Sequence, residues 1–121
     1  MTLVCGRVNF FSGPHLVFKY WLRGKFMRII IVGCGKVGSS IASELNLEGH
    51  EISVVDINHG AVDKLANSLD VLGIEGNGAT YDVLIEAGAE YADLLIAATA
   101  RDEINLYSCL MAKAAGVTHT I

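Results

Sequence analysis

Over most of the chain, short apolar runs alternate with longer segments in which apolar residues recur every three or four positions. A continuous apolar run that ends at glycine, such as 28–33, is typical of a strand buried on both faces. In the segment 36–49, Val37, Ile41 and Leu45 fall on one face of a helix. Repeated along the chain, these two patterns predict strands over 28–33, 51–56, 71–76, 92–99 and 117–121, and helices over 36–49, 59–70, 80–88 and 102–116.

The regular alternation of strands and helices predicts a parallel sheet with right-handed crossovers. The strands are apolar throughout, as expected when helices cover both faces of a sheet. We therefore expect an α/β fold with a Rossmann-like, doubly wound parallel sheet and five strands. A complete dinucleotide-binding sheet of this kind has six strands, so we expect the domain 27–121 to be C-terminally incomplete after strand five.

The first 26 residues differ from the rest of the chain. The leader 1–26 is basic and aromatic, whereas all thirteen acidic residues of the protein lie after it. Its apolar stretches are interrupted by Pro14, Lys19 and Arg23, and are too short for a membrane span or a secretory signal. We interpret the leader as non-native or disordered sequence ahead of a natural start at Met27. The alternative is a basic amphipathic segment at a membrane surface.

Composition narrows the class of protein. With 121 residues, 52% hydrophobic residues and one proline, the chain is expected to form one compact domain. The net charge of −4, with an acidic body, argues against a nucleic-acid partner. The three cysteines are scattered and lack C-x-x-C spacing, which predicts free thiols in a reducing compartment. The four histidines show no metal-ligand spacing, so no metal site is predicted.

The first predicted strand runs into three glycines spaced G-x-G-x-x-G, which are Gly33, Gly35 and Gly38. The first glycine permits a sharp turn, the second lets a pyrophosphate approach the backbone, and the third lets the helix pack closely on the strand. The helix that follows directs its unpaired amides and the positive end of its dipole at the same phosphate. In this strand–turn–helix context, the glycines predict a nucleotide site.

Asp56 ends the second predicted strand, 21 residues beyond Gly35. An acid at this place accepts hydrogen bonds from the adenosine ribose and repels a 2′-phosphate, which favours NAD or an adenine nucleotide over NADP. Lys36 is placed either to contact a phosphate or to remain a solvated surface lysine, and the spacing does not separate these roles. Cys34 is interpreted as a small tolerated residue rather than a redox centre.

Two more loops follow predicted strands, where ligands bind in open α/β sheets. In "GNGAT" (76–80), Asn77 can bond an adenine or ribose edge, and Thr80 is suited to cap the next helix. In "ATARDEINL" (98–106), the hydroxyl of Thr99 and the following amides can face the cofactor, and Asn105 can face the cleft.

Together, the segments "MRIIIVGCGKVGSSIASELNLEGHEISVVDIN", "GNGAT" and "ADLLIAATARDEINL" resemble the TrkA-N or RCK (KTN) domain of Trk/Ktr-type potassium transport regulatory subunits. The resemblance covers 27–121. It implies a regulatory domain without catalysis that binds NAD(H) or ATP/ADP. It also implies a cytoplasmic location, peripheral to the inner membrane face through a membrane potassium transporter subunit.

The resemblance also assigns roles to residues. It implies that the turn from Gly33 to Val37 holds the pyrophosphate, that Asp56 holds the ribose, and that Thr99 with Ala100 contacts the next part of the ligand. The alternative function is the NAD-binding domain of a dehydrogenase whose substrate domain is missing. Against it, no histidine or lysine is well placed at the ends of strands four and five to act as an acid or base.

The predicted helix 102–116 is apolar nearly all round, with Ile104, Tyr107 and Met111 on one side and further apolar residues around the circumference. Such a helix is buried on more than one side. We therefore expect a homodimer or a higher oligomer with this helix at the contact. The alternative is that another segment of the same chain covers it.

Overall fold

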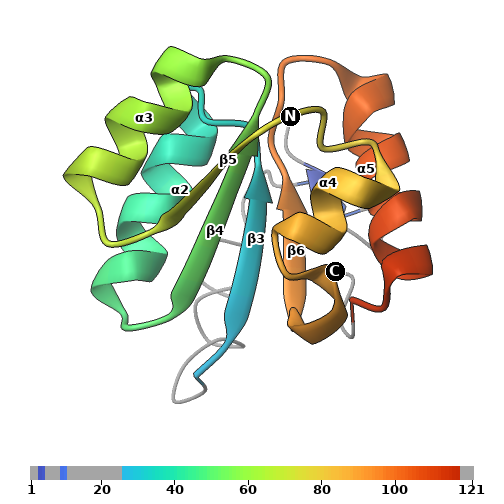
Figure 1. Ribbon diagram of the computed structural model, residues 1–121, viewed down its shortest axis with the longest axis horizontal. Coiled ribbons are helices and arrows are strands. Elements are labelled where there is room, and N and C mark those ends of the chain that lie inside the picture. Colours follow the sequence, from blue (N-terminus) through green and yellow to red (C-terminus); the bar gives the residue numbers. More distant parts are fainter. Residues whose placement is uncertain (1–2, 5–8, 11–25, 118–121) are drawn as a thin grey trace.

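The computed structural model describes residues 3–4, 9–10 and 26–117. These residues form a sheet in the order β2-β1-β6-β3-β4-β5 (Figure 1). The strands are β1 (Leu3–Val4), β2 (Asn9–Phe10), β3 (Arg28–Val32), β4 (Glu51–Asp56), β5 (Leu72–Glu75) and β6 (Leu94–Ala97). The helices are α2 (Lys36–Leu47), α3 (His59–Ser68), α4 (Tyr81–Glu86), α5 (Asp102–Ala115) and the short 3-10 helix η1 (Ala89–Tyr91).

Four strands form the parallel part of the sheet, with β3 between β4 and β6 and with β5 at the edge. Helices α2 and α3 cover one face, and α4 and α5 cover the other (Figure 1). Successive residues of β3 enter different cores: Ile29 and Ile31 pack with α2 and α3, whereas Ile30 and Val32 pack with α4 and α5. The prediction of a Rossmann-like, doubly wound α/β fold is therefore confirmed.

The predicted elements between residues 28 and 116 are all present, with ends that differ by one or two residues. Helix α2 ends before Gly49, whose φ of +87° is favoured by glycine. Strand β4 has the predicted ends. The predicted fifth strand lies outside the described residues except for Val117, which is buried but belongs to no strand.

Two short strands come from the leader, which the fold prediction had set aside. Strands β1 and β2 pair antiparallel with each other, and β1 also pairs antiparallel with β6. Without β1, this edge of β6 would carry unpaired backbone groups, and such an edge accepts an extended segment that reaches it. Apolar periodicity over a few residues gives no sign of this kind of pairing.

The apolar residues of α5 are arranged differently from the expectation. Small and polar side chains face the sheet, namely Asn105, Ser108, Ala112 and Ala115. Larger apolar side chains point to solvent, namely Leu106, Tyr107, Leu110 and Met111. A side of small residues lets the helix lie close to β6, so the bulky residues on the other side remain uncovered within the described part of the chain.

Within residues 3–4, 9–10 and 26–117, no helix is long and apolar enough to cross a membrane, and no three potential metal-ligating side chains cluster together. Cys34 is a free thiol, but Cys109 is disulfide-bonded, so the expectation of free thiols is wrong at that position.

Candidate functional site

A cavity of about 390 Å³ opens at the carboxyl ends of the parallel strands. Its volume lies in the range of small-molecule sites, roughly 300–1,000 Å³. The strand ends and the loops after them supply its walls, which are lined by Val32, Gly33, Gly35, Val55, Asp56, Ile57, Gly76, Asn77, Gly78, Ala98, Thr99, Ala100, Arg101 and Ile104.

The glycine turn between β3 and α2 forms the middle of this cavity. Gly33 has a φ of +111°, and a β-carbon there would lie 2.7 Å from the carbonyl oxygen of Ala98. At Gly38 a β-carbon would lie 1.8 Å from the carbonyl oxygen of Gly33, so the start of α2 packs directly on the turn. At Gly35 a β-carbon would meet no protein atom within 4 Å. Of the three glycines, Gly35 is therefore the one whose missing side chain leaves open room rather than protein contact.

The first turn of α2 carries no side-chain cap and no acidic residue. The first amides of a helix have no partner within the helix, so they are satisfied by solvent or by a ligand. An anion at this end is also favoured by the helix dipole. The turn thus presents unpaired donors beside the open room at Gly35.

The carboxylate of Asp56 is already tied to the backbone around it. Its Oδ2 accepts a hydrogen bond of 2.7 Å from the Cys34 amide, and its Oδ1 accepts one of 2.9 Å from the Asn58 amide. The first bond joins the end of β4 to the glycine turn. Each carboxylate oxygen can accept more than one hydrogen bond, so Asp56 keeps acceptor capacity for a ribose hydroxyl. The sequence indicated a binding role for this acid but not its structural one.

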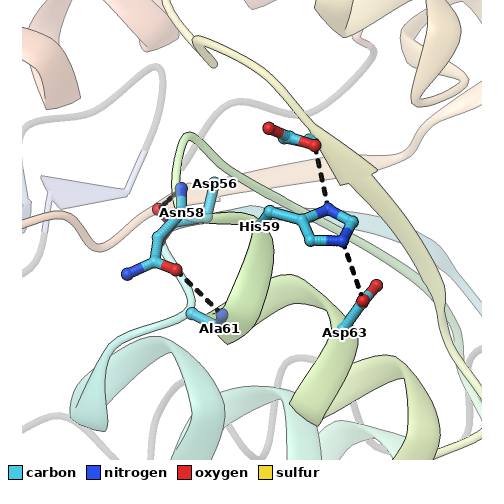
Figure 2. Close-up of polar contacts among 6 residues, drawn as sticks. Asp56, Asn58, His59, Ala61 and Asp63 are labelled. Carbon is cyan, nitrogen blue, oxygen red and sulfur yellow. Dashed lines mark hydrogen bonds and ion pairs between the residues drawn. The ribbon is translucent and has the colours of Figure 1, made fainter.

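The loop after β4 is held by α3, as Figure 2 shows. Asn58 caps this helix, its side-chain oxygen accepting a hydrogen bond of 3.1 Å from the Ala61 amide. The His59 ring lies between two carboxylates: Nδ1 is 2.9 Å from Glu75 Oε2, and Nε2 is 3.0 Å from Asp63 Oδ2. His59 is exposed, and it ties the start of α3 to the end of β5 beside Asp56.

The loop after β5 brings Asn77 to the cavity. The side-chain oxygen of Asn77 accepts a hydrogen bond of 2.9 Å from the Ala79 amide, which shapes the loop. Thr80 stands at the cap position of α4, but its hydroxyl donates to the carbonyl of Asn77 at 2.8 Å and makes no capping bond. The expectation that Thr80 caps the helix through its side chain is therefore wrong.

The loop after β6 is fixed by the buried side chain of Asn105. Its Oδ1 lies 3.0 Å from the Thr99 amide and 2.6 Å from the Thr99 hydroxyl, and its Nδ2 donates to the Thr99 carbonyl at 3.2 Å. The expectation that Asn105 faces the cleft is therefore wrong: its side chain is buried and holds the loop after β6 in place. Thr99 lines the cavity, although its hydroxyl is turned toward Asn105.

The structure brings together most of the predicted binding residues, and their binding role stays a prediction. The residues that line the cavity are Gly33, Gly35, Asp56, Asn77, Thr99 and Ala100. The residues that do not line it are Cys34, Lys36, Val37 and Gly38. Three further lining residues were not predicted as binding residues: Ile57, which follows Asp56, and Arg101 and Ile104, which lie within the segment 98–106.

Cys34 is part of the glycine turn, and its side chain is buried. Burial, and secondarily the charge of Asp56, raises the pKa of its thiol from 9.0 to about 11. At neutral pH the group is therefore a thiol, which is the unreactive form. This agrees with the interpretation of Cys34 as a small tolerated residue rather than a redox centre.

The arrangement fits a nucleotide in three respects. There is open room at Gly35, an uncapped helix end stands beside it, and a carboxylate with spare acceptor capacity lies at the end of the next strand. Its described lining residues include no histidine, lysine, cysteine or tyrosine. The cavity is therefore equipped to bind and orient an adenosine phosphate, and Asp56, whose two oxygens each accept a backbone amide, is the one described lining residue of a type that commonly transfers protons.

Comparison with protein families matches residues 29–121 to the TrkA-N domain. Three curated relatives carry related names. The Trk system potassium uptake protein TrkA of Azorhizobium caulinodans is 42% identical over 69% of this chain, which covers 18% of that protein. The TrkA homolog of Archaeoglobus fulgidus is 39% identical over 78% of this chain and 21% of its own length. The TrkA homolog of Pyrococcus abyssi is 34% identical over 72% of this chain, which covers 38% of that protein. The chain thus spans only a minor part of these relatives.

Solved structures are similar in fold. The Bordetella bronchiseptica enzyme WbmG in complex with NAD aligns with a TM-score of 0.57 and 24% identity, over 78% of this chain and 36% of that one. AtPrR2 with NADP+ and (+)pinoresinol aligns with a TM-score of 0.59 and 23% identity, over 76% of this chain and 34% of that one. At this level of identity the likeness concerns the fold.

Proposed function

The chain belongs to the TrkA-N domain family, and from that premise we propose that it is a nucleotide-sensing regulatory domain of a potassium uptake system. In this proposal the cavity binds NAD(H) or ATP/ADP without catalysis. The observation that carries it is the meeting of the glycine turn, the uncapped end of α2 and Asp56 at one cavity. Names of relatives such as the Trk system potassium uptake protein TrkA supply the transport context.

The proposed binding mode follows from the positions of these groups. The phosphates lie against the turn at Gly35, where the amides of α2 stabilise their charge. The adenosine ribose lies at Asp56, and the base lies toward Asn77 in the next loop. The loop from Thr99 to Ala100 contacts the far part of the ligand. Occupancy then changes how the domain contacts a membrane potassium transporter subunit, at the cytoplasmic face of the membrane.

Calorimetric titration of the chain with NADH, ADP, ATP and NADPH tests binding. We expect NADH and the adenine nucleotides to bind and NADPH to bind more weakly, because Asp56 repels a 2′-phosphate. Asp56→Ala is expected to weaken NADH binding by about 1–3 kcal/mol, the usual cost of losing a charged hydrogen-bond partner. Asp56→Asn removes the charge and keeps an acceptor oxygen for one of the two backbone amides that Asp56 binds, so it disturbs the turn less than Asp56→Ala does. Glu44→Ala, which removes an exposed carboxylate of α2 outside the cavity, serves as the control.

Two results would contradict this proposal. If NADPH bound as tightly as NADH, Asp56 would not have the role assigned to it. If no nucleotide bound to the folded chain, the cavity would not be a nucleotide site.

The second candidate is the NAD-binding domain of a dehydrogenase. It is favoured by the structural neighbours, one solved in complex with NAD and one with NADP+. It predicts hydride transfer, whereas the regulatory proposal predicts none, because the described lining holds no histidine, lysine, cysteine or tyrosine and its single carboxylate, Asp56, is assigned to the ribose. Incubation with NAD and a panel of hydroxy acids, followed at the nicotinamide absorbance, separates the two. Clear cofactor-dependent turnover would favour the dehydrogenase.

A further inference from the structure

The two charged residues among the described lining of the cavity stand on different strands. Asp56 ends β4, and Arg101 follows β6. Strand β3 runs between these two strands, so the glycine turn at its end lies between the carboxylate and the guanidinium. The cavity therefore has an acidic end, a middle of backbone amides, and a basic end.

The backbone of Arg101 is fixed. Its amide donates to the Thr99 hydroxyl at 3.2 Å, and its carbonyl accepts the Asn105 amide at 3.1 Å as the first bond of α5. Asn105, fully buried, in turn binds Thr99 through both ends of its side chain. The Cα of Arg101 thus keeps its place at the cavity whatever its side chain contacts.

Among the described residues, the guanidinium of Arg101 has one partner, which is a neighbour on the surface. Its Nε and Nη2 lie 2.8 and 2.7 Å from one oxygen of Glu103, and the two side chains are 70% and 52% exposed. A hydrogen bond to its own amide and the contact with Arg101 lower the pKa of Glu103, so this partner is ionised at neutral pH. Exposed pairs of this kind contribute little to stability, so another anion can replace the carboxylate. Phosphate oxygens match the guanidinium fork as well as a carboxylate does.

We propose that Arg101 is a specificity-determining residue that exchanges Glu103 for the terminal phosphate of a nucleoside di- or triphosphate. The inference rests on the proposed nucleotide site and adds to it a residue that distinguishes ligands by the charge of their terminal phosphate. With adenosine at Asp56 and the first phosphate at the glycine turn, further phosphates extend toward the loop after β6. A terminal phosphate brings more negative charge there than a dinucleotide, whose two phosphates are both interior. Arg101 then favours ATP and ADP, and Glu103 competes with them.

The test is a set of calorimetric titrations of the chain with AMP, ADP, ATP and NADH. Arg101→Gln is expected to weaken ATP binding about tenfold or more, the effect of losing a charge-assisted hydrogen bond. Its effect on ADP should be smaller, and AMP, whose phosphate ends at the glycine turn, should change by less than about twofold. Glu103→Gln is expected to strengthen ATP binding by about two- to threefold, because the competing carboxylate is removed.

Two controls separate this proposal from a general effect of charge. Lys113→Gln removes a cation from the last turn of α5, about 18 Å along the helix axis from Arg101. It should leave the ratio of the ATP and AMP affinities unchanged. Arg101→Lys keeps the charge but not the fork, and should restore part of the ATP affinity. Circular dichroism of each variant checks that the fold is kept.

The outcomes are distinguishable. Equal weakening of AMP and ATP by Arg101→Gln would overturn the proposal, because the residue would then only shape the loop. If Lys113→Gln weakened ATP binding as much as Arg101→Gln does, the proposal would also be overturned, because the long-range electrostatic field of the protein would then explain the effect. If AMP, ADP, ATP and NADH all failed to bind the unmodified chain, the proposed function itself would fall, whereas retained binding without phosphate dependence would remove only the role of Arg101.

Discussion

A single added methyl group separates two roles within the glycine turn. Gly38→Ala would place a β-carbon 1.8 Å from the Gly33 carbonyl oxygen, and we expect it to lower the free energy of unfolding by about 3 kcal/mol or more. Gly35→Ala has open space and an extended conformation (φ −74°, ψ −165°) that alanine adopts, so we expect a change within about 1 kcal/mol. The same methyl group enters the cavity and should weaken nucleotide binding. Urea denaturation and calorimetry of both variants check this pair. Unchanged nucleotide affinity in Gly35→Ala would show that no phosphate approaches the backbone there.

The buried thiol of Cys34 makes the free energy of unfolding depend on pH in the alkaline range. Its pKa is about 11 in the folded protein and near 9.0 when the chain is unfolded. Between these values the unfolded state loses a proton that the folded state keeps, so the free energy of unfolding falls as pH rises from 9 to 11. Below pH 9 this contribution is fully present. Urea denaturation at several alkaline pH values should show a steeper decline for the unmodified protein than for Cys34→Ala. Parallel declines would mean that Cys34 is not the responsible group.

At the scale of elements, the junction of β6 with α5 depends on one buried amide. Asn105→Leu keeps the size of the side chain but leaves the Thr99 amide and carbonyl without their partner. We expect it to cost about 2–3 kcal/mol of stability and to speed hydrogen exchange in the loop 98–101. The matched control is Ser108→Ala on the same buried face, because the Ser108 hydroxyl has no hydrogen-bond partner within the described part of the chain. That control should be close to neutral. Equal effects of the two variants would mean that Asn105 contributes packing alone.

At the scale of the whole molecule, the solvent-facing side of α5 predicts self-association. Leu106, Tyr107, Leu110 and Met111 form one exposed apolar surface on this helix. Contiguous exposed apolar surface is uncommon on a monomer and marks an interaction site. We expect the chain to sediment as a dimer or larger species at tens of micromolar, and Met111→Lys to shift it toward monomer. Leu47→Lys, at a lone exposed leucine on α2, should leave the assembly unchanged. A monomeric unmodified chain under these conditions would refute the prediction.

The amino-acid sequence by itself determined the order and type of the elements between residues 28 and 116. Strands such as β3 are continuous apolar runs, and helices such as α2 carry apolar residues on one face, so local pattern and burial agree. The G-x-G-x-x-G spacing and Asp56 also determined where a cavity would open, because parallel strands bring their carboxyl ends to one edge. These features depend on residues near each other in the chain, or on a topology that the alternation of strands and helices dictates.

Only the tertiary structure decided what each side chain near the cavity contacts. Asn105 turned out to be buried beneath the loop, and the carboxylate of Asp56 to bind the Cys34 amide 22 residues away. Arg101 reached the cavity lining, and the side of α5 that faces the sheet proved to be the one with small residues. Each of these outcomes is set by the distance between elements that are remote in sequence. Periodicity reports which positions are apolar, but the approach of a helix to a sheet selects which of them are covered.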